Sequence, residues 1–75
     1  MTQMEVVYLY GSHPGEREMR ALDALREVYG IRKLKFDRDL RQVRVEYDAS
    51  RFKEPVVAAM LRRAGIDLRE QKILA

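Results

Sequence analysis

The sequence predicts an α+β fold in which strands and helices follow the order β-α-β-β-α-β. Residues 4–10, 31–37 and 42–48 are short segments, rich in Val and Tyr or alternating in polarity, that are typical of strands. Two longer segments carry apolar residues three and four positions apart, as amphipathic helices do. Two right-handed crossovers in this order give one four-stranded antiparallel sheet with both helices on one face.

The first strand is expected over residues 4–10 and is closed by Gly11. Side chains alternate between the two faces of a strand. We expect Val7 and Leu9 to face the core. The other positions then lie on the face that no helix covers: Val6, Tyr8 and Tyr10.

Proline and glycine mark the two helices. The first is expected to begin at Pro14 and to run to about Tyr29, and the second to begin near Pro55. Proline suits the first helical turn, and glycine suits the left-handed residue after a helix, so Gly30 and Gly65 are expected to end them. The expected buried stripes are Ala21, Leu22, Ala24, Leu25 and Val28 in the first helix, and Val57, Ala58, Leu61 and Ala64 in the second.

The remaining strands complete a ferredoxin-like sandwich, a single domain over residues 1–75. Residues 31–37 and 42–48 flank a turn, residues 66–74 hold the last strand, and Phe52 is expected to cover the core. The expected inward side chains are Ile31, Leu34, Phe36, Val43, Val45 and Tyr47. The open sheet face is expected to carry Tyr8, Tyr10, Lys33, Lys35, Arg44 and Glu46.

The composition and charge of the chain exclude several classes of protein. The absence of cysteine excludes disulfides and thiolate-bound zinc. No apolar run approaches the roughly 20 residues that cross a bilayer, and no signal sequence is evident, so we expect a cytoplasmic protein without a membrane partner. The net charge of +3 comes from basic residues interleaved with acidic ones, which indicates a solvated surface rather than a nucleic-acid stripe.

Several segments resemble the heavy-metal-associated domain of copper chaperones and metal-transporting ATPases. Residues 11–14 (GSHP) stand where that family has Gly-Met-Thr-Cys, and residues 24–31 resemble its Ala-Leu-x-x-x-x-Gly-Val helix exit. Residues 34–36 and 45–48 are similar to its Val-x-Val and Val-x-Tyr-Asp strand segments, and residues 58–66 to its Ala-Ala-Ile-x-x-Ala-Gly-Tyr segment. The resemblance covers most of the chain without a gap. It implies the same βαββαβ scaffold and a relation to metal transport.

The chain departs from that family at the metal site. The family binds soft ions such as Cu(I) through Cys-x-x-Cys, and the ungapped match places Pro14 and Arg17 at the two cysteine positions. The neighbouring His13, with Glu16 and Met19, could ligate Zn or Cu instead. One imidazole and one carboxylate fall short of the three or four protein ligands that zinc takes, so we expect no cofactor. Residual metal binding through His13 is the alternative.

Catalysis is not expected. Ser12 and His13 are adjacent in sequence and lack the third member of a triad. The glycine-containing loop lacks the lysine of a phosphate-binding loop, and Glu16 and Glu18 would repel a phosphate. The sequence therefore favours a non-enzymatic binding domain.

Two kinds of partner fit the expected open sheet face. A protein partner or a second copy would contact the tyrosine-bearing face or pair with a strand edge. Its expected contact residues are Tyr8, Tyr10, Lys33, Lys35 and Arg44. Single-stranded RNA would stack on the two tyrosines, but the outward Arg44 and Glu46 of the third strand lack the paired aromatics of RNA-recognition motifs. We therefore expect protein contacts, with RNA as the alternative.

Overall fold

The computed structural model describes residues 3–72, which form four strands and two helices in the predicted order. The strands are β1 (Gln3–Tyr10), β2 (Ile31–Asp37), β3 (Gln42–Asp48) and β4 (Leu68–Lys72). The helices are α1 (Glu16–Leu25) and α2 (Glu54–Arg63). Residues 73–74, which the sequence assigns to the last strand, lie outside the described residues. Within residues 3–72, no helix is long and apolar enough to cross a bilayer.

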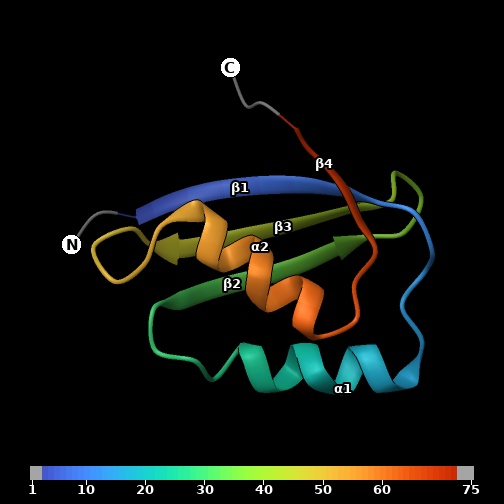
Figure 1. The fold of residues 1–75 in the computed structure, drawn as a ribbon, viewed down its shortest axis with the longest axis horizontal. Coiled ribbons are helices and arrows are strands. Elements are labelled where there is room, and N and C mark those ends of the chain that lie inside the picture. The colour runs from blue at the N-terminus through green and yellow to red at the C-terminus, as the bar shows by residue number, and fades with distance from the viewer. Residues whose placement is uncertain (1–2, 73–75) are drawn as a thin grey trace.

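The strands form one antiparallel sheet in the order β2-β3-β1-β4, which is the ferredoxin-like arrangement. The central strands β1 and β3 pair from Gln3 opposite Asp48 to Leu9 opposite Gln42. Figure 1 shows α2 crossing in front of the sheet. The loop from β1 to α1 lies at one end of the sheet, and the loop from β3 to α2 lies at the other (Figure 1). The predicted fold class is confirmed.

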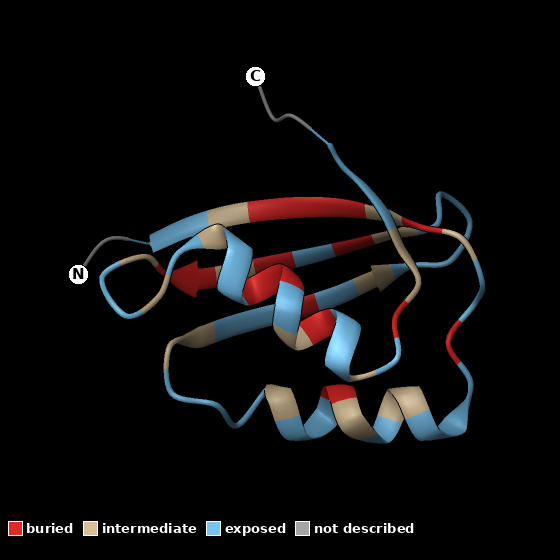
Figure 2. Ribbon diagram, viewed as in Figure 1, coloured by how far each residue is buried: buried red, intermediate tan, exposed pale blue. Residues whose placement is uncertain are grey.

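The core lies between the two helices and one face of the sheet (Figure 2). Leu22 of α1 and Leu61 of α2 are fully buried there, with Val43 and Val45 of β3 beneath them. Tyr47 is buried as predicted, and Phe52 stacks on its ring with centroids 6.1 Å apart. The inward and outward positions of β3 are therefore those that the sequence predicted.

The predicted orientation of β1 is wrong. Tyr8 and Tyr10 are only 3% and 2% exposed and belong to the core cluster together with Val6. The reason is the register of the sheet, because residues directly opposite in an antiparallel pair share a face. Tyr8 pairs with the inward Val43, so it too must face the helices, and Leu9 must face away.

The first helix ends four residues earlier than predicted, at Leu25. The amides of Glu27 and Val28 donate to carbonyls only three residues back, which marks a tightened last turn. The Gly30 carbonyl already accepts the Asp48 amide of β3 at 2.7 Å, so residues 26–29 must span from helix to sheet. Val28 of the expected buried stripe is exposed for this reason, and Ala24, although it lies inside α1, is exposed as well.

The second helix ends as predicted. Gly65 has a φ of +94°, and its amide donates to Arg62 while the Ile66 amide donates back to Leu61. This pair of bonds is the Schellman arrangement, which glycine permits because it has no Cβ. Val57, Ala58 and Leu61 form the buried face as expected, and Ala64 is half-buried.

Replacing Tyr8 tests its placement in the core. We expect Tyr8→Ala to lower the free energy of unfolding by about 3–5 kcal/mol, as removal of a buried aromatic ring does. Tyr8→Phe keeps the ring and should cost only about 1–2 kcal/mol. Tyr29→Ala is the control, because that ring is 70% exposed and its loss should cost less than about 1 kcal/mol. Urea denaturation measures all three; equal midpoints for Tyr8→Ala and Tyr29→Ala would contradict the buried position.

Candidate functional site

The loop between β1 and α1 is held in place by the chain itself. The Gly11 amide donates to the Asp67 carbonyl at 2.9 Å, and the Ser12 amide to the Asp67 carboxylate at 3.3 Å. Arg41 donates to the Gly11 carbonyl at 3.2 Å. At the start of α1, the Gly15 amide donates to the Glu18 carboxylate at 3.0 Å. Two of the loop amides that could meet an anion are therefore bonded to carboxylates of this chain.

Pro14 and Arg17 stand at the two cysteine positions of the family, and neither can bind a soft metal ion. Pro14 is buried and Arg17 is exposed on the first turn of α1. A pyrrolidine ring and a guanidinium supply no thiolate for a soft metal ion. The loop therefore has no thiolate pair at these positions.

The alternative metal ligands are not brought together. His13 is exposed and its ring lies edge-on to Tyr10, with centroids 5.8 Å apart. The Glu16 carboxylate is paired with Arg20 at 2.7 Å, and Met19 packs against the core. Within residues 3–72, no group of three or more His, Cys, Asp or Glu side chains could hold a metal ion.

The sheet face opposite the helices carries charged side chains, and no helix of residues 3–72 packs on it. Glu5, Lys33, Lys35, Arg44 and Glu46 line a shallow hollow of about 160 Å³ on this face. Tyr8 and Tyr10, which the sequence placed here, are on the other side of the sheet. The predicted contact face therefore keeps its lysines and arginine and loses its aromatic rings.

The charges on this face follow the cross-strand register. One row across the sheet consists of Lys33 on β2, Glu46 on β3 and Glu5 on β1. The next row consists of Lys35 on β2, Arg44 on β3 and Val7 on β1, and Lys72 of β4 stands opposite Val7. Arg44 pairs with Glu5 at 3.0 Å and Lys33 with Glu46 at 3.8 Å. In the part of the chain that the structure describes, Lys35 makes no ion pair. One carboxylate oxygen of Glu46 is buried there without a hydrogen bond.

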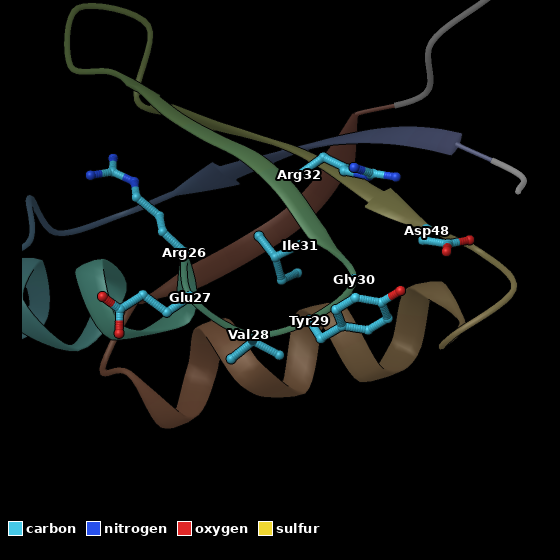
Figure 3. Close-up of a pocket in the computed structure, with 8 residues that line it drawn as sticks. All are labelled: Arg26, Glu27, Val28, Tyr29, Gly30, Ile31, Arg32 and Asp48. Carbon is cyan, nitrogen blue, oxygen red and sulfur yellow. The ribbon is translucent and has the colours of Figure 1, made fainter.

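A second hollow, of about 440 Å³, lies where the chain enters β2. In Figure 3 the side chains of Tyr29, Arg32 and Asp48 point to the same side of it. The Arg51 guanidinium lies 3.9 Å from the centre of the exposed Tyr29 ring, a cation–π contact that orients the ring. Hydrogen bonds from the hydroxyl and then the amide of Ser50 hold the pKa of Asp48 below its usual range.

A third hollow lies between α2 and β4, and Tyr8 is one of the residues that line it. The Tyr8 hydroxyl donates to the Glu54 carboxylate at 2.6 Å. Burial, and then this hydrogen bond, raise the pKa of Tyr8 well above its usual range. Arg62 and Gln71 line the same hollow from the helix and the strand.

Sequence reasoning missed both of these hollows. Tyr29 was assigned to the first helix, so its exposure and its contact with Arg51 could not be expected. The signal for Tyr8 and Glu54 was present, because a tyrosine on an inward strand position needs a polar partner at its tip. This signal depends on the orientation of β1, and the sequence predicts the opposite orientation.

The comparisons with known proteins give no match. No protein-family model, no curated protein and no solved structure matches this chain. The structure shows the ferredoxin-like fold, and a fold does not by itself specify a function.

The buried phenol of Tyr8 predicts a loss of stability in alkali. Its pKa is higher in the folded than in the unfolded protein, where it is about 10. The stability that it contributes is therefore complete below pH 10 and declines as the pH rises above that value. Urea midpoints between pH 8 and pH 12 should fall more steeply for the wild type than for Tyr8→Phe. Tyr29→Phe, which retains the buried phenol, should follow the wild type; parallel curves for the wild type and Tyr8→Phe would contradict the prediction.

Proposed function

We propose that this chain is a non-enzymatic binding domain that contacts a partner protein through the charged sheet face. The scaffold is of the heavy-metal-associated type that its segments resemble, without the thiolate pair of that family. The partner surface carries acidic side chains opposite Lys35 and Arg44. The observation that carries the proposal is the open, charged face formed by the residues of the shallow hollow.

The charges that are left without partners support a protein ligand. Lys35 has no ion pair among residues 3–72, and the cation of Arg44 is shared with only one carboxylate, that of Glu5. Arrays of complementary charge give an interface its register and its association rate.

The arrangement of the same face argues against RNA. Stacking needs aromatic rings on the exposed side of the central strands. The residues on that side of the central strands are Glu5, Val7 and Leu9 on β1, of which Val7 is buried, and Gln42, Arg44 and Glu46 on β3. The two tyrosines that supported the RNA alternative are buried against the helices, so neither ring can stack on a base.

Metal trafficking has less support than protein binding. The loop next to α1 holds His13 as its one imidazole, while Glu16 and Met19 are engaged in an ion pair and in the core. Catalysis has equally little support. The Ser50 hydroxyl donates to the Asp48 carboxylate, whose lowered pKa makes it a weak base, and the Tyr8 hydroxyl that donates to Glu54 belongs to a buried residue. A binding surface is the simplest function for these side chains.

A charge reversal tests the proposed face. Lys35→Glu should abolish retention of the partner from an extract of the source cells, because it puts like charges together at the centre of the contact. Lys53→Glu is the matched control, since it makes the same charge change at an exposed lysine before α2. Quantitative mass spectrometry of proteins retained by the immobilised wild type and both variants measures the effect. Retention that is equal for all three, or that falls equally for both variants, would contradict the proposal.

A further inference from the structure

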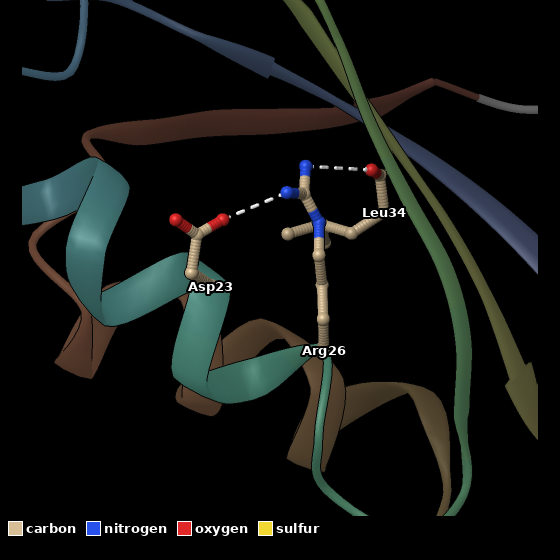
Figure 4. Close-up of polar contacts among 3 residues, drawn as sticks. All are labelled: Asp23, Arg26 and Leu34. Atoms are coloured by element: carbon tan, nitrogen blue, oxygen red, sulfur yellow. Dashed lines mark hydrogen bonds and ion pairs between the residues drawn. The ribbon is translucent and has the colours of Figure 1, made fainter.

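The two edges of the sheet differ in whether a side chain forms a hydrogen bond to the backbone of the edge strand. The outer edge of β2 is occupied by Arg26, which donates to the Leu34 carbonyl at 3.1 Å and is held by Asp23 at 2.7 Å (Figure 4). An edge carbonyl that is already bonded is a poorer template for another strand. At the other edge, no side chain of residues 3–72 is bonded to the backbone of Gln71 in β4.

The hydrogen bonds of the neighbouring strands show which way the Gln71 backbone points. The Tyr10 amide donates towards β3, to the Arg41 carbonyl, and the Gly11 amide donates towards β4, to the Asp67 carbonyl. Backbone groups alternate in direction along a strand, so those of Val7 and Leu9 point towards β4. Their partners are Lys72 and Glu70, which therefore bond inward. The amide and carbonyl of Gln71 point outward, away from β1.

We propose that the outer edge of β4 pairs antiparallel with β4 of a second copy of this chain. Gln71 stands opposite Gln71 of the partner subunit at the two-fold axis, and the two residues exchange two backbone hydrogen bonds. Two residues of this strand, Glu70 and Lys72, are two positions apart and lie on one face. In this register Glu70 is opposite Lys72 of the partner subunit, and the symmetry repeats that ion pair.

The charge sequence of β4 selects this register over its neighbours. A two-fold pairing must bring together positions of the same parity, because both copies present the same face. Centring the pair on Arg69, Glu70 or Lys72 would place two like charges directly opposite each other, which is unfavourable. Centring it on Gln71 places opposite charges together twice. This complementarity is why the occupant is a second copy rather than another peptide.

Charge swaps test both the dimer and its register. Sedimentation velocity on the full chain from 10 µM to 1 mM should show a concentration-dependent dimer. Lys72→Glu and Glu70→Lys should each weaken it roughly tenfold, because two attractive pairs become repulsive. The double variant Glu70→Lys/Lys72→Glu should restore the dimer, and an equimolar mixture of the two single variants should form a heterodimer. Lys53→Glu, with the same charge change away from β4, should leave the dimer unchanged.

A backbone variant provides a second, independent measurement. Gln71→Pro removes an amide that points to solvent, so the bonds between β4 and β1 remain and the circular dichroism spectrum should be unchanged. The dimer should be lost. A wild type that is monomeric throughout the range would overturn the proposal, as would a dimer whose dissociation constant is unchanged by Lys72→Glu or a dimer that survives Gln71→Pro. Lys35→Glu leaves the β4 edge intact, so failure of the partner-binding face and failure of this dimer are separable.

Discussion

The pairing of β1 with β3 is the constraint on which the rest of this structure depends. Val43, Val45 and Tyr47 must face the helices, because β3 has no other set of apolar side chains. Antiparallel partners share a face, so the register then directs Tyr8 inward. A slip of one residue would exchange every side chain of β1 between the core and the solvent. The inward set gives the core two tyrosines and leaves the open face with charge.

The orientation of β1 also decides what each surface can do. With Tyr8 inside, its hydroxyl meets Glu54 and links the central strand to the start of α2. With Tyr10 inside, its ring packs against Phe36 and against His13 at the beginning of the loop. The open face retains Lys35, Arg44 and their acidic neighbours, which can select a partner by charge but cannot stack a base.

The sequence predicted the element order, both β2 and β3 boundaries and the end of α2, because each had an unambiguous local signal. The strict alternation of polar and apolar residues predicted β3, and the glycine in Ala64-Gly65-Ile66 predicted the turn that ends α2. The orientation of β1 was ambiguous, since both of its faces are apolar and period alone cannot choose between them. The early end of α1 depends on the hydrogen bond between Gly30 and Asp48, a tertiary contact. For the candidate site, the positions of Lys33, Lys35 and Arg44 were predictable from β2 and β3, whereas those of the tyrosines were not.

Nuclear Overhauser spectroscopy of the ¹³C,¹⁵N-labelled protein tests the orientation of β1 most directly. Tyr8 and Ala58 line the same hollow between α2 and β4, so the ring protons of Tyr8 should give cross-peaks to the Ala58 methyl group. On the other face, the methyl groups of Val7 should give cross-peaks to the side chain of Arg44, which stands opposite. Cross-peaks from the Tyr8 ring to the side chains of Lys35 or Arg44 would contradict the account.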